Sequence, residues 1–352
     1  MMRRWLRVAI PVAAVLASGG AAQASNGNKP RQPVRWAEAD CAQIVDLSQT
    51  PVLHLEYAIG EEDVGMTPDE VDDSRTMQFF AFRRQDFRIA PPPWITQADV
   101  TRAADADPVN VVPSAITADD VLESSSRFSS SDWLRITADD ARVPITFDQA
   151  AMGVDWDLAG ATPGTYQLWG YTWEPVLNIW SARPGFVKLV ASAAAAADAG
   201  PSIALLDDEA VVTAGEGHPV LGCADVADGS TVTLQWGAKV GSVEPQWQTV
   251  IEDEAIASGA LTLEFVPPDA AAGQVVQLRA TVRDPQGHEY TAYGARVLSV
   301  MADPDGGGDD GGDGGGGGCS CGVPSDRGRI AAAWLAAVLV VRLRRRSEAV
   351  AR

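Results

Sequence analysis

The stretch Thr231–Trp236, "TVTLQW", alternates polar and apolar residues with a period of two, and Val275–Val282, "VVQLRATV", does so as well. This period is typical of strands with one face in a core and the other in water. Turn signals such as Asp228-Gly229-Ser230 separate further apolar stretches on either side. We expect strands at Ile203–Val212, Pro219–Asp225, Thr231–Trp236, Trp247–Ile251, Leu261–Val266, Val275–Val282 and Tyr290–Val300. This many short strands in about 100 residues favours a β-sandwich over residues 203–301.

Cys223 and Trp236, 13 residues apart, resemble the cysteine and core tryptophan of immunoglobulin-like domains. The second cysteine of that family is missing, because "QLRATV" at 277–282 contains none. The resemblance implies an immunoglobulin-like fold for this region and implies no disulfide within it.

The region 36–191 predicts a first sandwich-like domain that is less regular. "PVLHLEYAI" and "MQFFAFRR" resemble early strands, and "GTYQLWGYTW", "NIW" and "GFVKLV" resemble closing strands. Pro163–Tyr166, "PGTY", resembles the turn and tyrosine that open a late strand in immunoglobulin-like modules. A long insertion near 89–132 interrupts the pattern, and "ITQAD" at 95–99 and "ITADD" at 116–120 and 136–140 predict short helical turns capped by threonine. We therefore expect a mainly β chain with two β-sandwich domains, separated by an alanine-rich linker at 192–202.

The first 24 residues have the three parts of a secretory signal peptide. Arg3, Arg4 and Arg7 form a charged end, Val8–Ala17 is an apolar run, and Ala22-Gln23-Ala24 is a small-x-small cleavage site. Signal peptidase is then a processing partner, and residues 25–35 form a flexible leader to the exported chain.

The C-terminal end combines a glycine–aspartate segment, close cysteines, a short apolar run and an arginine cluster. Residues 302–318 predict a disordered spacer. Ile330–Val341 has 12 residues, and a helix of that length covers about 18 Å, less than the ~30 Å hydrocarbon core of a membrane. Arg342–Arg346 would remain cytoplasmic, which places the upstream chain outside.

This order, over residues 319–352, resembles the tripartite sorting signal of myxobacterial surface proteins. The matching residues are Cys319-Ser320-Cys321-Gly322, the apolar helix and the arginine cluster. The resemblance implies that a membrane-bound sorting protease cuts near the cysteines and that the protein stays on the cell envelope or surface. One departure is that Arg327 and Arg329 precede the helix and shorten it. The alternative is a plain single-pass anchor on a glycine linker.

The formal net charge is −20, and the ends carry much of the positive charge. Such an acidic chain repels phosphate backbones, which argues against a nucleic-acid partner. Of the four cysteines, Cys41 and Cys223 lie in the region expected to fold. Export permits a disulfide between them, and two buried thiols are the alternative because the two residues fall in different predicted domains.

The sequence contains no zinc-protease, nucleophile-elbow, Walker or dinucleotide motif, so we predict no catalytic residue, metal or cofactor. The best candidate site is aromatic. Trp169, Tyr171 and Trp173 share one face of a predicted strand, and Trp180 follows soon after. This face is either covered by the insertion or the second domain, or exposed as a surface that stacks on sugars or a partner.

We therefore expect an exported, envelope-anchored, non-catalytic protein with a binding, adhesion or structural role, and a glycan or an envelope protein as its partner. Acidic clusters such as Glu61-Glu62-Asp63 leave a carboxylate-based glycan hydrolase as one alternative. An envelope assembly subunit is another.

Overall fold

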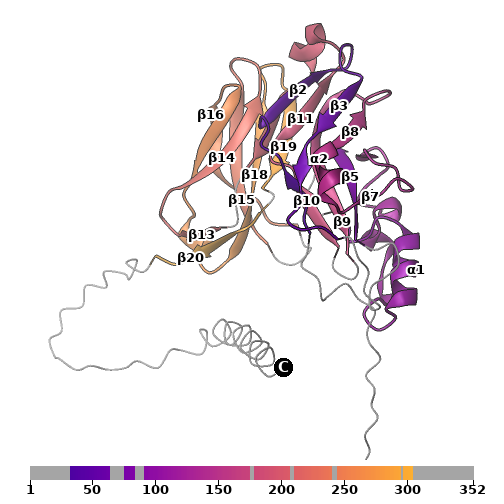
Figure 1. Ribbon diagram of the computed structural model, residues 1–352. Coiled ribbons are helices and arrows are strands. Elements are labelled where there is room, and N and C mark those ends of the chain that lie inside the picture. Colours follow the sequence, from indigo (N-terminus) through magenta and orange to yellow (C-terminus); the bar gives the residue numbers. More distant parts are fainter. Residues whose placement is uncertain are drawn as a thin grey trace, which may run out of the picture. The chain divides into compact units, whose positions relative to one another are not determined.

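The computed structural model describes residues 32–63, 75–83, 91–174, 178–206, 210–239, 244–294 and 296–303. The predicted signal peptide, the glycine–aspartate spacer and the C-terminal sorting signal lie outside these residues. The described residues form a mainly β structure with two sandwiches in one compact unit (Figure 1). Among them, no helix combines the length and apolar character needed to cross a membrane.

The second sandwich has two facing sheets. One contains, in order, β12 (Ser202–Leu205), β14 (His218–Asp225) and β17 (Gly259–Phe265). The other has the order β13 (Ala210–Thr213), β20 (Leu298–Met301), β18 (Val275–Arg283), β15 (Thr231–Ala238) and β16 (Gln248–Ala255), with β19 (Glu289–Tyr293) also paired to β18. The alternating residues of β15 and β18 fill the core between the sheets: Val232, Leu234, Trp236, Val276, Leu278, Ala280 and Val282 are all buried.

Two of the expected strands are each divided in the structure. The stretch expected at 203–212 forms β12 and β13, which belong to different sheets, because β13 leaves the β14 side and pairs in parallel with β20. The stretch expected at 290–300 forms β19 and β20, which both pair with β18. Period-two alternation does not mark the point where a chain crosses between sheets, so these breaks have no signal in the pattern.

The large sheet of the first sandwich repeats the strand order of the larger sheet of the second, around a separate core. Its large sheet runs β2 (Ala42–Asp46), β11 (Phe186–Val190), β9 (Gly164–Trp173), β5 (Thr76–Arg83) and β6 (Trp133–Arg135). Strand β10 (Ile179–Ala182) also pairs with β9, and β7 (Val143–Pro144) pairs with β5. The facing pairs are β3 (Val52–Leu55) with β8 (Val154–Asp157), and β1 (Arg35–Trp36) with β4 (Tyr57–Ala58). The parallel pair β2–β11 corresponds to β13–β20 in the second sandwich.

The "PGTY" turn opens β9 as the sequence predicts. The Tyr166 hydroxyl donates a 2.8 Å hydrogen bond to the Thr162 carbonyl, four residues upstream. This is the tyrosine-corner geometry found at the start of a late strand in immunoglobulin-like sandwiches.

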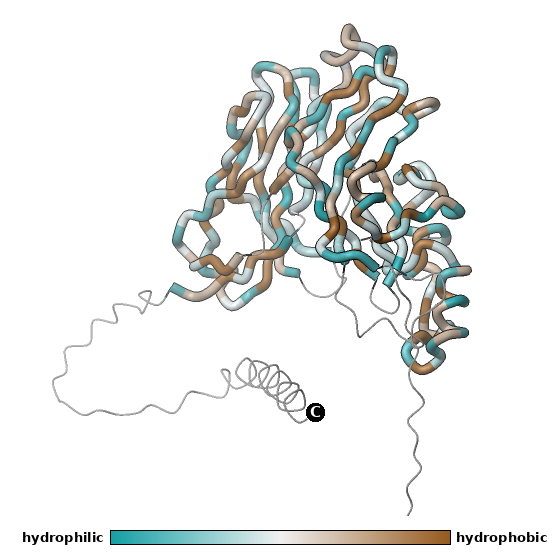
Figure 2. The backbone as a smooth tube through the Cα atoms, viewed as in Figure 1, coloured by the Kyte–Doolittle hydropathy of each residue, from teal (hydrophilic) through white to brown (hydrophobic). Residues whose placement is uncertain are grey.

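Much of the segment between β5 and β8 covers the outer face of the large sheet. This part contains α1 (Gln97–Ala106) and the short 3₁₀ turns Pro113–Ala115, Ala118–Asp120 and Leu122–Ser124. Helix α2 (Phe147–Met152) lies instead beside β4, and its Ala150 packs in the core between the sheets. Apolar residues recur along this segment as they do along the strands (Figure 2). They form a cluster with the sheet around Phe80, Phe82, Tyr171 and Trp173.

Threonine caps begin two of the three repeated motifs. Thr96 Oγ1 accepts from the Asp99 amide at 3.0 Å and starts α1, and Thr117 forms a capping box with Asp120. In the third copy, Thr137 Oγ1 instead accepts from the Phe79 amide at 2.9 Å. This copy therefore fastens the insertion to β5 and caps no helix.

Candidate functional site

A disulfide joins the two sandwiches. Cys41 and Cys223 are bonded, with their Cα atoms 5.9 Å apart, and the bond lies against Phe186 and Ala204. Val220 and Ala224 of β14 point into the second core, so Cys223 points outward toward the first sandwich. This differs from the position implied by the immunoglobulin-like resemblance, in which the cysteine packs against the core tryptophan. The alternation of side chains along β14 turns Cys223 away from the core in which Trp236 is buried.

Polar contacts strengthen the same junction. The Lys188 ammonium is buried and donates to Asp225 Oδ2 at 2.5 Å and to the Gly200 carbonyl at 2.6 Å. The Thr165 and Ser202 hydroxyls are 2.5 Å apart. The turn between β10 and β11 needs Gly185, because its φ is +81° and a Cβ there would lie 2.0 Å from the Cys41 carbonyl oxygen. The disulfide and the Lys188–Asp225 ion pair hold the junction, and the close approach at Gly185 positions Cys41 within the first sandwich.

Two of the four aromatic candidates are covered. Tyr171 and Trp173 are fully buried beneath the insertion. The Tyr171 hydroxyl donates to the Pro93 carbonyl at 3.1 Å, and burial raises the pKa of Tyr171 well above its usual value. Guanidinium groups from Arg102 and Arg142 lie 5.1 and 5.4 Å from the Trp173 ring centroid. These two residues therefore belong to a core and offer no binding surface.

The other two candidates, Trp169 and Trp180, are half-buried at the edge of that cluster. Their ring centroids are 6.2 Å apart at an interplanar angle of 87°. Trp180 Nε1 donates to the Pro92 carbonyl at 2.8 Å, and Trp169 Nε1 donates to Gln167 Oε1 at 3.0 Å. Both indoles are thus held in fixed orientations, with part of each ring open.

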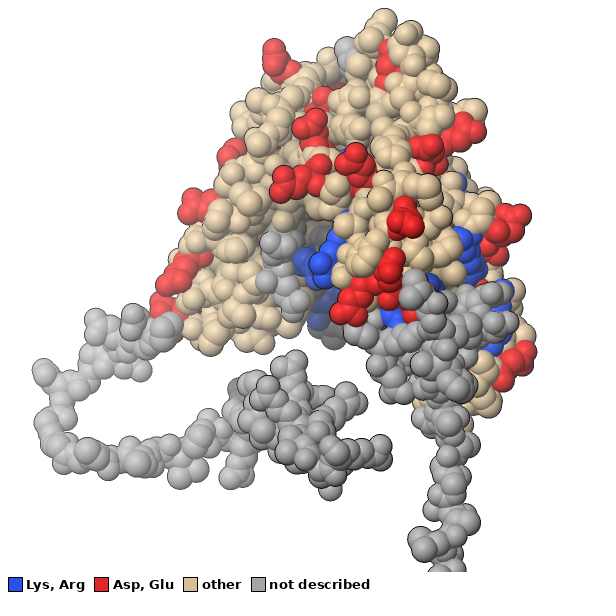
Figure 3. Space-filling model, viewed as in Figure 1, with Lys and Arg blue, Asp and Glu red and all other residues tan. Residues whose placement is uncertain are grey.

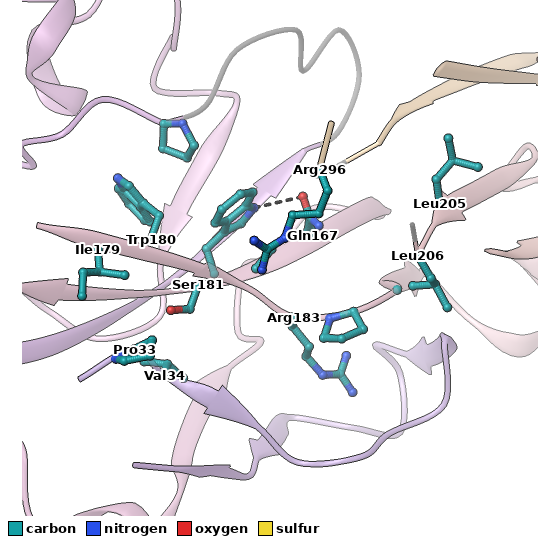
Figure 4. Close-up of a pocket in the computed structure, with 15 residues that line it drawn as sticks. Pro33, Val34, Gln167, Ile179, Trp180, Ser181, Arg183, Leu205, Leu206 and Arg296 are labelled. Atoms are coloured by element: carbon teal, nitrogen blue, oxygen red, sulfur yellow. Dashed lines mark hydrogen bonds between the residues drawn. The ribbon is translucent and has the colours of Figure 1, made fainter. Parts of the chain in front are cut away.

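These indoles line a pocket of about 580 Å³, here named the junction pocket (Figure 4). Strand β10 runs along it, and Trp36 Nε1 holds that strand by donating to the Ser181 carbonyl at 2.9 Å. The second sandwich contributes Leu205, Leu206 and Arg296. The remaining lining residues are Pro33, Val34, Pro91, Gln167, Ile179, Ser181, Ala182, Arg183, Pro184 and Gly185. Both sandwiches are therefore needed to form the pocket.

The charge of the junction pocket contrasts with that of the chain. Among the described residues, its lining includes Arg183 and Arg296 and no Asp or Glu, although the chain has 47 acidic and 27 basic residues. Figure 3 shows Lys and Arg side chains in the hollow of this face, with Asp and Glu spread over the surrounding surface. Burial lowers the pKa of the Arg183 guanidinium, while the charge of Asp40 acts in the opposite direction.

A smaller pocket of about 270 Å³ lies on the other side of Arg183. It is lined by Glu38, Asp40, Glu56 and His54 among others. Arg183 therefore separates an acidic pocket from the junction pocket. No group of three or more His, Cys, Asp or Glu residues in the described part of the chain is placed to hold a metal ion.

The predicted carboxylate cluster has structural contacts. Glu62 Oε1 accepts from the Phe147 amide at 2.8 Å at the start of α2. Asp63 Oδ2 lies 2.8 Å from Nε of the buried Arg75. The processing residues Ala22, Ala24, Cys319 and Cys321 lie outside the described residues. Sequence reasoning missed Arg183 and Arg296, because a lone arginine beside a turn carries no pattern that marks it as part of a site.

Comparisons with known proteins give little. No protein-family model matches the chain, and no curated protein matches it. Among solved structures, one titled "Structure or murine CRIg" overlaps 29% of this chain and 98% of that chain, with 12% sequence identity and a TM-score of 0.19. A TM-score this low does not establish that the two chains share a fold.

Proposed function

We propose that this chain is an exported, envelope-anchored protein that binds a ligand, without catalysis, in the junction pocket between its two sandwiches. Export and anchoring are proposed from the sequence of the two ends. Residues 1–24 match a secretory signal in charge, apolar length and cleavage site, and residues 319–352 resemble a surface-protein sorting signal.

The observation that carries the binding role is a pocket with oriented indoles at a braced junction. Ligand sites occur preferentially at domain interfaces and combine apolar walls with a few placed polar groups. The junction pocket has this composition, with Trp169 and Trp180 beside Gln167, Ser181 and two arginines. Because the disulfide and Lys188 fix the junction, little ordering is needed when a ligand binds.

The described lining of the junction pocket holds no pair of carboxylates, and this supports binding over hydrolysis. A glycoside hydrolase of the usual kind needs two carboxyl groups about 5–10 Å apart on either side of the scissile bond. The described lining of the junction pocket supplies neither. Glu62 and Asp63, the carboxylates noted in the sequence, are engaged with the α2 amide and Arg75.

The proposal is tested on the protein as cells produce it. We expect intact-mass measurement of the envelope fraction to find a chain that begins near Ser25 and lacks Ile330–Arg352, and protease added to intact cells to digest it. A Cys319→Ala, Cys321→Ala variant should keep its tail, whereas Ser325→Ala, a control in the same segment, should be processed normally. Finding the wild-type tail still attached would contradict the sorting interpretation, and a protein resistant to protease on intact cells would contradict surface display.

A further inference from the structure

The two edges of the large sheet in the second sandwich are unlike one another. At one edge, β16 carries Glu252, Asp253 and Glu254, its register shifts against β15, and Asp253 has a φ of +49°. Charges and bulges of this kind keep an edge strand from pairing with another chain. At the other edge, β13 has the uncharged sequence Ala-Val-Val-Thr, and β20 is its only partner among the described strands. The features that protect β16 are therefore not found in β13.

The backbone of β13 presents hydrogen-bonding groups at its open edge. The register with β20 runs from Ala210 to Thr213 without a shift. The Ala214 amide continues this register by donating to the Met301 carbonyl at 2.8 Å. Because backbone groups alternate in direction along a strand, the amides of Val211 and Thr213 point away from β20, toward the open edge. An added strand can therefore bond there without displacing β20.

The outer face of the sheet beside this edge is apolar. Val211 is 68% exposed, the highest value among the exposed large apolar residues of the described chain, and Met301 and Val275 are 59% and 43% exposed. In the register of the three strands, Ser299 lies between Val211 and Val275, and Thr213 lies beside Met301. These outward residues include no charged side chain, although 21% of the chain is charged. Apolar residues grouped on one exposed face mark a contact site between proteins.

The first sandwich shows what the equivalent edge does within this molecule. Its β2–β11 pair corresponds to β13–β20, so β2 is the counterpart of β13. Strand β2 begins directly after Cys41, whose disulfide with Cys223 joins the sandwiches, and it lies against β14 of the second sandwich. The edge at which another sandwich docks on the first sandwich is thus open in the second. A second copy of the chain, which brings further sandwiches of this kind, is the occupant that this comparison indicates.

We propose that two copies of this chain associate through β13, with the two edge strands side by side and Val211 of each copy against the apolar patch of the other. A contact in which a strand meets its own copy is self-complementary, as in most symmetric dimers. The chain continues from β20, beside this edge, toward the proposed anchor (Figure 1). Copies anchored on one envelope therefore have a raised local concentration, which strengthens weak contacts, and this last step alone rests on the proposed function.

Sedimentation of the purified exported protein over a range of concentrations tests the association. Strand β13 has only four residues, so we expect a dimer of micromolar affinity or weaker, as for other small interfaces. We expect Val211→Glu to weaken the dimer about tenfold or more, because a charge on an edge strand opposes pairing. The melting temperature should not change, because this side chain is exposed. Leu221→Glu, which alters a 53% exposed residue of the other sheet, should leave the dimer intact.

Hydrogen exchange and salt provide two further readouts. The amides of Val211 and Thr213 should exchange about tenfold more slowly when the protein is dimeric, because pairing protects them, whereas the amides of β16 should not change. Each copy has a formal net charge of −20, so the two copies repel one another. Added salt should therefore strengthen the dimer by screening this repulsion.

Several outcomes would overturn the inference. A protein that stays monomeric at about 1 mM, where even a millimolar contact is populated, does not use this edge. Equal weakening by Val211→Glu and Leu221→Glu, or a dimer in which exchange along β13 is not slowed, places the contact elsewhere. A dimer that dissociates as salt is added is held by opposite charges and not by the apolar edge. Val211→Glu should leave processing of the tail unchanged, so failure of this inference is distinguishable from failure of the proposed anchoring.

Discussion

Trp169 and Trp173 lie four residues apart on one face of β9, yet their surroundings differ. Trp173 is enclosed by the insertion and flanked by Arg102 and Arg142. Trp169 keeps part of its ring open to the junction pocket. The sequence predicts that the two residues share a face, because side chains alternate along a strand. It does not predict which part of that face is covered, because this depends on where a distant segment packs.

Replacing Trp173 with alanine should leave a cavity in a filled core. We expect the free energy of unfolding to fall by about 3–5 kcal/mol, as for other large-to-small core changes. Phe147→Ala is the control, because that ring is 52% exposed and surface changes usually stay within about 0.5 kcal/mol. Chemical denaturation measures both variants. Equal stability of Trp173→Ala and the wild type would mean that the insertion does not cover this face.

At the scale of elements, period-two alternation predicted the strands of the second sandwich well. β14, β15 and β18 lie where Pro219–Asp225, Thr231–Trp236 and Val275–Val282 were expected, with Val232, Leu234 and Trp236 inward. Alternation also explains why Cys223 points out of the second core, because the next residue, Ala224, points into it.

The insertion is the element that sequence reasoning described least well. Its capped turns were anticipated at Thr96 and Thr117, but its attachment to the sheet was not. That attachment uses Arg142, which lies 2.8 Å from the buried Asp99 and 2.8 Å from Asp139. Burial opposes ionisation of Asp139, but hydrogen bonding and the charges of Arg142 and Arg135 outweigh it, so the pKa of Asp139 is lowered. The Arg142–Asp99 pair joins residues 43 positions apart, and a pair at that separation leaves no periodic signal in a sequence.

For the whole molecule, the central feature is the fixed junction of two sandwiches whose large sheets share one strand order. Each sandwich has its own core, so each has an internal source of stability. The Cys41–Cys223 bond and the ion pair between Lys188 and Asp225 cross the junction. The sequence left open whether the two cysteines pair, because spacing alone does not say which surfaces of two domains meet.

Loss of the disulfide should weaken the molecule at this junction. We expect a Cys41→Ser, Cys223→Ser variant to lose about 2–5 kcal/mol of stability, the usual cost of removing a native disulfide. Far-ultraviolet circular dichroism should change little, since both cores remain. Reductant should lower the melting temperature of the wild type and have no effect on the variant. A wild-type melting temperature that does not respond to reductant would show that the bond contributes nothing to holding the sandwiches together.

The central claim, that ligands bind in the junction pocket, is tested most directly by hydroxyl-radical footprinting of the free and the envelope-bound protein. Mass spectrometry of the peptides reports the oxidation of each side chain. We expect binding to protect Trp169, Trp180 and Leu206, which line the pocket. Met152, which is 60% exposed outside it, should be oxidised equally in both states. Protection at Met152, with oxidation of Trp169 and Trp180 unchanged, would contradict the account.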